Sequence, residues 1–127
     1  MIIMLQIFAL LRVHQWYKNL IVFAVLFFSG NFISDGYAWL SLFCAFICLC
    51  LLSSANYILN DIVDKEKDKL DKFKSKRPIA SGKVSVKLAT IVALVLLTLS
   101  LIFGFYLNLY FGISLTLLFV LTQIYSF

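Results

Sequence analysis

The sequence predicts an all-α fold, a polytopic membrane helix bundle with about four transmembrane helices. Of its 127 residues, 63% are hydrophobic and 13% are charged, and the mean hydropathy is +1.01. The charged residues gather in short stretches and leave long uncharged runs between them. A soluble domain of this size does not need so much apolar sequence, so residues 1–127 are expected to belong to one membrane domain.

The first element is an uncharged, mostly apolar run over residues 1–11. Such a run is too short to cross about 30 Å of hydrocarbon, so we expect a short helix that lies at the interface or leads into the first span. A signal peptide is disfavoured, because no basic residue precedes the run and no small-residue cleavage site follows it. Arg12 and Lys18 then flank Trp16, a grouping typical of the headgroup region.

Four longer runs supply the expected spans, which are residues 19–34, 37–59, 84–104 and 109–127. The first of them is short, but Lys18 at its foot can lengthen it by snorkelling. Glycines predict the turns between spans. Gly30–Gly36 is expected to connect the first two spans, and Gly104–Gly112, which contains Asn108, the last two.

The basic residues give the bundle an orientation. Arg12 and Lys18 precede the first span, and the rest of the 11 basic residues lie between residues 60 and 87. With the N-terminus inside, all of them fall on the cytoplasmic side, as the positive-inside rule requires. We therefore expect an integral protein of the cell (plasma) membrane, with its N-terminus and its 60–87 loop in the cytoplasm.

The net charge of +5 is explained by this topology, so no nucleic-acid partner is expected. A basic loop at the membrane surface would instead attract anionic membrane lipids or a diphosphate substrate.

A stripe of amide and carboxylate side chains ends the second span. Asn56, Asn60, Asp64 and Asp68 recur at every fourth position, which places them on one face of a helix. Their oxygens suit hard cations, and Mg²⁺ is usually held by one or two carboxylates plus substrate phosphates. Because polar residues at membrane depth are costly, they usually face a functional cavity.

Plainer interpretations stay open beside this one. The stripe also fits the solvated end of a membrane helix. Arg12 and Lys18 fit equally well as topology charges and as phosphate-binding residues. The cysteines, Cys44, Cys48 and Cys50, are interpreted as small buried apolar residues, because no histidine or further cysteine completes a metal set.

A carboxylate stripe beside a basic loop suits the departure of a diphosphate leaving group. Mg²⁺ held by Asp64 and Asp68 would neutralise the charge that develops on the diphosphate, and Asn60 would add or orient a ligand. Nearby basic residues would complete a phosphate clamp. The sequence shows no serine or cysteine nucleophile with its base and no P-loop, so nothing supports covalent catalysis.

These motifs resemble those of the UbiA-type superfamily of membrane prenyltransferases. Its first signature, N-x-x-x-D-x-x-x-D at the cytoplasmic end of the second membrane helix, is matched by Asn60, Asp64 and Asp68. Asp61 completes the common Asn-Asp pair, and RPIASG at residues 77–82 matches the Arg-Pro and small-residue turn of the next loop. The stretches at residues 12–19 and 60–82 look closest to the decaprenyl-phosphate phosphoribosyltransferase branch.

The resemblance implies a transferase that moves 5-phosphoribosyl from soluble phosphoribosyl diphosphate to a polyprenyl phosphate, with Mg²⁺ as cofactor. By that resemblance Asn60, Asp64 and Asp68 are catalytic, with the metal on Asp64 and Asp68. The expected substrate-binding residues are Arg12, Lys18, Asn56, Asp61, Lys76 and Arg77.

Two other functions stay open. An aromatic prenyltransferase would take a prenyl diphosphate lipid as its donor, and an inactive truncated membrane protein would only bind lipid through its basic loop. Superfamily members have about nine membrane helices and a second Asp-rich motif in their C-terminal half. The present sequence therefore resembles only the N-terminal part of such a protein. The last acidic residue here is Asp71. We therefore expect an N-terminal fragment that needs the missing C-terminal helices of the same fold.

Overall fold

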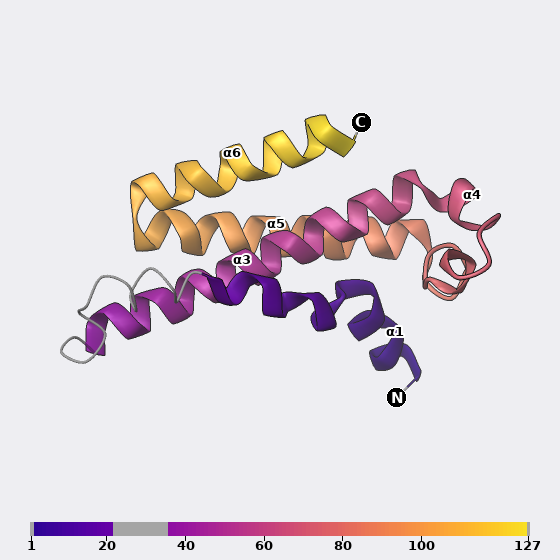
Figure 1. Ribbon diagram of the computed structural model, residues 1–127, viewed down its shortest axis with the longest axis horizontal. Coiled ribbons are helices and arrows are strands. Elements are labelled where there is room, and N and C mark those ends of the chain that lie inside the picture. Colours follow the sequence, from indigo (N-terminus) through magenta and orange to yellow (C-terminus); the bar gives the residue numbers. More distant parts are fainter. Residues whose placement is uncertain (1, 22–35, 127) are drawn as a thin grey trace.

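The computed structural model describes residues 2–21 and 36–126, and over these residues the chain is a helix bundle without strands (Figure 1). The long helices are α3 (Gly36–Val63), α5 (Val86–Leu107) and α6 (Leu109–Ser126). The shorter elements are α1 (Ile2–Leu11), η1 (Val13–Ile21), α4 (Lys65–Asp68) and η2 (Lys74–Lys76). The predicted all-α membrane bundle is confirmed, because α3, α5 and α6 are each long and apolar enough to cross a membrane.

The described spans agree with the last three that the sequence predicts. The helix predicted for the first residues is also present, as α1. The expected first span at 19–34 and most of the Gly30–Gly36 turn lie outside the described residues. Residues 19–21, which are described, belong to η1.

Small side chains let α5 approach α3 closely. The buried residues of α5 include Ala89, Ala93 and Ser100, and a fourth, Gly104, faces Leu115 of α6 instead. Residues of this size at a membrane-helix interface allow the backbones to pack closely. Ser100 adds a hydrogen bond, donating its hydroxyl to the carbonyl oxygen of Cys48 at 2.8 Å.

Asn108 makes the predicted turn between α5 and α6. Its Oδ1 accepts the backbone N–H of Tyr110 at 2.8 Å and that of Phe111 at 3.4 Å, so it caps the start of α6. Gly104 and Gly112 were expected to mark the turn, but Gly104 lies inside α5 and Gly112 inside α6. A Cβ on Gly112 would collide with the ring of Phe105, so glycine is needed there for close packing.

The loop after α4 folds back onto the bundle. Ile79 is buried in one apolar cluster with Leu10, Ile58 and Val84. The loop turns at Gly82, whose φ of +81° is a conformation that favours glycine. This return brings the residues just before Ile79 back to the end of α3.

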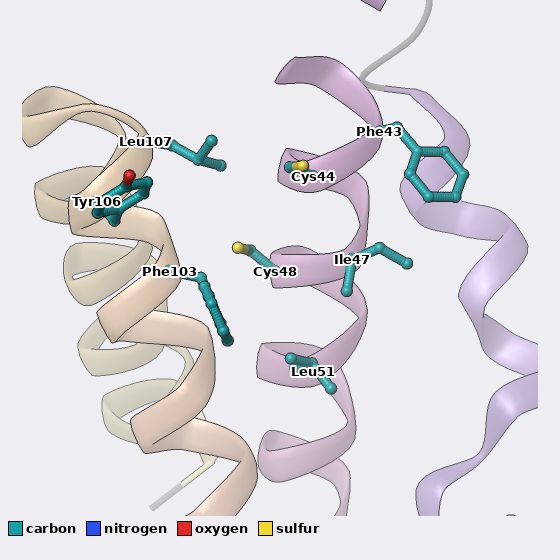
Figure 2. Close-up of a pocket in the computed structure, with 8 residues that line it drawn as sticks. All are labelled: Phe43, Cys44, Ile47, Cys48, Leu51, Phe103, Tyr106 and Leu107. Carbon is teal, nitrogen blue, oxygen red and sulfur yellow. The ribbon is translucent and has the colours of Figure 1, made fainter. Parts of the chain in front are cut away.

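The two ends of the bundle differ in chemistry. Figure 1 shows α4 and both chain termini toward one end, called the basic end here because it carries the lysine-rich loop. Toward the other end, α3 and α5 line an open pocket of about 370 Å³ (Figure 2). Its lining is apolar and includes Phe43, Cys48 and Phe103. Polar chemistry is therefore concentrated at the basic end.

Candidate functional site

The Asn/Asp stripe crosses a short break at the end of α3. The helix ends at Val63, and α4 begins at Lys65. The backbone N–H of Asp64 still donates to the carbonyl of Asn60 at 3.0 Å, and that of Asp68 to Asp64 at 2.7 Å. These bonds keep the four-residue register, so the predicted spacing survives the break.

Two buried carboxylates share two arginines at this end. Asp61 is 3% exposed, and its Oδ1 accepts from Arg12 Nη2 at 2.6 Å and from Arg77 Nη1 at 3.3 Å. Arg77 Nη1 also donates to Oδ2 of Asp68, which is 2% exposed, at 3.0 Å. Two negative and two positive groups balance, and this pairing is what allows the carboxylates to be buried.

Arg12 reaches Asp61 from the corner between α1 and η1. Its φ is +52°, in the left-handed region that residues other than glycine seldom adopt. Such a conformation costs on the order of 1 kcal/mol and persists where surrounding contacts hold it. The ion pair with Asp61 is one such contact, and the Tyr57 ring, whose centroid is 4.8 Å from the guanidinium carbon, is another.

Polar contacts fix η1 along α3. The buried hydroxyl of Ser54 donates to the carbonyl of Leu11 at 2.7 Å and accepts from Trp16 Nε1 at 2.9 Å. Asn19 donates its side-chain N–H to Ser53 Oγ at 3.3 Å. Trp16, expected in a headgroup belt, thus uses its ring N–H to tie the N-terminal segment to α3.

Asn60 and Asp64 differ from their paired neighbours. Both side chains are half-buried. Neither makes an ion pair or a side-chain hydrogen bond within the residues that the structure describes. Their oxygens are therefore available to a ligand, whereas Asp61 and one oxygen of Asp68 already have partners.

The remaining predicted residues fall into two groups. Asn56 lies on α3 and accepts a hydrogen bond from Gln123 of α6 at 2.8 Å. Lys18 and Lys76 are exposed, and neither joins the described ion pairs of the site. The structure thus gathers Arg12 and Arg77 around the carboxylates and leaves the two lysines at the surface.

A magnesium ion fits this donor set only with help from a substrate. Among the described residues, no group of three or more His, Cys, Asp or Glu side chains could hold a metal by itself. Asp64 and Asn60 offer a carboxylate and an amide oxygen, and Mg²⁺ is usually held by one or two carboxylates together with substrate phosphates. The assignment of the metal to Asp64 and Asp68 stays a prediction.

Three residues of this region carry no motif and were missed from the sequence. They are Ser54, Tyr57 and Gln123, and each acts through a partner at least 38 residues away in the sequence, such as Trp16 for Ser54. The available signal is weak: each is a polar or amphipathic residue in an otherwise apolar run. Only the folded bundle shows what each one contacts.

Comparison with known proteins matches residues 19–127 to the UbiA prenyltransferase family. The chain is 40% identical to the uncharacterized protein y4nM of Sinorhizobium fredii, over 68% of this chain and 17% of that protein. It is 37% identical to a decaprenyl-phosphate phosphoribosyltransferase of Mycolicibacterium smegmatis, over 76% and 31%. It is 31% identical to a digeranylgeranylglyceryl phosphate synthase of Sulfurisphaera tokodaii, over 84% and 37%. The chain therefore spans well under half the length of these relatives.

Proposed function

Because the chain belongs to the UbiA prenyltransferase family, we propose that it serves in a membrane transferase that uses a diphosphate donor. The donor in this proposal is phosphoribosyl diphosphate, and the acceptor is a polyprenyl phosphate. Support comes from the relative named decaprenyl-phosphate phosphoribosyltransferase, which is 37% identical. Because the donor is soluble, the proposal places the basic end in the cytoplasm.

One observation carries the proposal: side-chain oxygens without a described partner occur on the same chain segment as a carboxylate that binds two arginines. Asp64 and Asn60 are one helical turn apart and have no described partner. Arg12 and Arg77 converge on the carboxylate of Asp61 and remain 18% and 28% exposed. A bound diphosphate would therefore find oxygen ligands for its cation and guanidinium donors for its own oxygens in one place.

Mg²⁺, when bound, would neutralise the charge on the leaving diphosphate. Asp64 would hold the ion and Asn60 would add or orient a ligand. Asp68 would contribute through its second oxygen or after release from Arg77, which occupies Oδ2. Asp61 would keep Arg12 and Arg77 directed at the phosphates, and Lys18 and Lys76 would attract the donor from solution.

The reaction needs no covalent intermediate on the protein. A phosphate oxygen of the acceptor lipid forms the bond to C1 of the ribose as the bond from C1 to the diphosphate oxygen breaks. The diphosphate leaves with the bonding electron pair. A dianionic acceptor has no proton to lose in this step, so the site needs charge stabilisation and alignment more than a general base.

The test is donor binding and transfer by the chain in proteoliposomes. Labelled phosphoribosyl diphosphate is added with Mg²⁺ and decaprenyl phosphate, and bound donor and labelled lipid are both counted. We expect metal-dependent donor binding that Asp64→Asn weakens by about tenfold, equal to about 1.4 kcal/mol. The matched control is Glu66→Gln, since Glu66 is 80% exposed and pairs with Lys69. Equal binding by Asp64→Asn and the wild type would contradict the proposal.

The same assay separates the alternatives. The aromatic prenyltransferase alternative has a prenyl diphosphate as its donor, and the match to a prenyltransferase family keeps that donor as the rival. If unlabelled geranylgeranyl diphosphate binds more tightly than phosphoribosyl diphosphate, the prenyltransferase alternative replaces the proposal. If neither donor binds and only neutralising the loop lysines changes binding to anionic vesicles, the lipid-binding alternative replaces it.

A further inference from the structure

We propose that Gln123 is a positioning residue that turns the amide N–H groups of Asn56 toward the phosphate of the acceptor lipid. The inference rests on the proposed function, and it adds a residue of α6 to a site otherwise built from α3 and the segments before and after it. It also specifies how Asn56, which is expected among the substrate-binding residues, would bind: as a hydrogen-bond donor.

The contact between the two amides determines which atoms of Asn56 stay free. Gln123 Nε2 donates to Asn56 Oδ1 at 2.8 Å, and both side chains are half-buried. This bond engages the oxygen of Asn56. The Nδ2 group keeps two N–H donors that have no described partner. An amide N–H group cannot coordinate a cation, but it can donate a hydrogen bond to a phosphate oxygen.

Asn56 borders a cavity that such a ligand can enter. The cavity lies between α3 and α6, measures about 200 Å³, and is lined by Leu52, Ser53, Asn56, Tyr57, Leu118 and Thr122. The Thr122 hydroxyl donates to the Leu118 carbonyl at 2.7 Å. The Ser53 hydroxyl accepts from Asn19 and keeps its own O–H donor, and the Tyr57 hydroxyl has no described hydrogen bond. Asn56 therefore adds two free N–H donors to the single O–H donors of Ser53 and Tyr57 at this cavity.

The position of Asn56 along α3 fits the acceptor better than the donor. Asn56 precedes Asn60 by one turn and Asp64 by two, which is about 6 and 12 Å along the axis at about 1.5 Å per residue. It thus lies on the membrane side of the residues proposed to hold the metal. A lipid phosphate bound there would approach the diphosphate donor from the membrane, as its hydrocarbon chain requires.

The experiment measures binding of decaprenyl monophosphate to the chain in nanodiscs, by native mass spectrometry, without metal or donor. Gln123→Met keeps the length of the side chain and loses the hydrogen bond. Gln123→Glu, when ionised at pH 8, can only accept, so it would draw the Asn56 N–H groups away from the cavity. We expect each to weaken binding of the monophosphate about fivefold, the equivalent of one hydrogen bond. Binding of decaprenol, which lacks the phosphate, should not change.

The control is Ser114→Ala, because Ser114 is exposed on α6 and its hydroxyl bonds to the Tyr110 carbonyl of the same helix. Thermal melting of each variant shows whether a loss of binding reflects unfolding. If folded Gln123→Glu binds the monophosphate as well as the wild type, the inference is wrong. Since the assay contains no donor, failure of the donor proposal is a separate result.

Discussion

Asp61 and Asp64 are three residues apart on the same chain segment, yet their surroundings are opposite. Asp61 is 3% exposed and accepts from two arginines, whereas Asp64 is half-buried and has no described partner. The difference comes from tertiary contacts, because Arg12 of the N-terminal corner and Arg77 of the returning loop both pair with Asp61, and neither makes a described ion pair with Asp64. Asp61 is therefore tied into the fold by ion pairs, whereas the Asp64 carboxylate has no described partner, as the proposed metal site requires.

The largest expected effect is a difference in the free energy of unfolding between variants of these two carboxylates. Asp61→Ala leaves Arg12 and Arg77 without their shared acceptor, so we expect a loss of about 3 kcal/mol in the free energy of unfolding. Asp64→Ala should change it by less than about 0.5 kcal/mol. Urea unfolding in detergent micelles, followed by circular dichroism, measures both. Equal losses of unfolding free energy in Asp61→Ala and Asp64→Ala would show that the two carboxylates do not differ in their contribution to stability.

The hydrogen bonds of Ser54 hold the N-terminal segment against α3, and this segment carries Arg12, which pairs with Asp61. Ser54→Ala removes a fully buried hydroxyl and leaves the Leu11 carbonyl and the Trp16 N–H without a partner. We expect a cost of about 2 kcal/mol. The control Ser114→Ala should cost almost nothing, because that hydroxyl is exposed. The same unfolding assay applies, and a Ser54 variant as stable as the control would show that these hydrogen bonds are not needed.

The α5–α6 contact lies away from both carboxylates and tests whether stability and ligand binding can be separated. Gly112→Ala would push its methyl group into the Phe105 ring. We expect a net loss of about 1 kcal/mol, since overpacking costs more than the better helix propensity of alanine returns. Metal-dependent donor binding, measured on the folded variant, should stay at the wild-type level. A loss of donor binding in the folded variant would show that the two regions are coupled.

The smallest expected effect concerns Asp71, which lies in the exposed loop. Its carboxylate accepts the backbone N–H groups of Lys74 and Phe73, and these bonds lower the pKa of the carboxyl from its ordinary value. A lowered pKa stabilises the folded loop above the pKa of the unfolded chain, near 3.9, and the effect disappears as pH falls through the folded value. Asp71→Asn should therefore melt slightly lower than the wild type at pH 7, and this gap should shrink as pH falls below about 3.9. A gap that stays constant from pH 7 into the acid range, for as long as both proteins remain folded, would contradict this origin.

The sequence predicts much of the fold because its signals are local. The apolar runs place α3, α5 and α6, and Asn108 supplies the turn chemistry between the last two. The four-residue spacing of Asn60, Asp64 and Asp68 also survives in the structure, although a turn at Asp64 separates α3 from α4.

Which carboxylates pair with arginines depends on contacts between residues far apart in the sequence, and the sequence therefore could not predict it. Arg12 is 49 residues from Asp61, and it reaches that carboxylate only through a backbone corner of positive φ. Arg77 reaches Asp61 and Asp68 only because Ile79 is buried in the core and returns the loop. Asp68 shares the sequence spacing of Asp64 but not its surroundings, since its burial beside Arg77 depends on that tertiary contact.

The most direct measurement is Mn²⁺ binding by electron paramagnetic resonance, with inorganic diphosphate present and the chain in nanodiscs. Mn²⁺ substitutes for Mg²⁺, and the comparison is among the wild type, Asp64→Asn and Glu66→Gln. If Asn60 and Asp64 hold the metal together with diphosphate, Asp64→Asn weakens Mn²⁺ binding by about tenfold, and the surface variant Glu66→Gln leaves it unchanged. Unchanged binding in Asp64→Asn would show that Asp64 does not hold the metal.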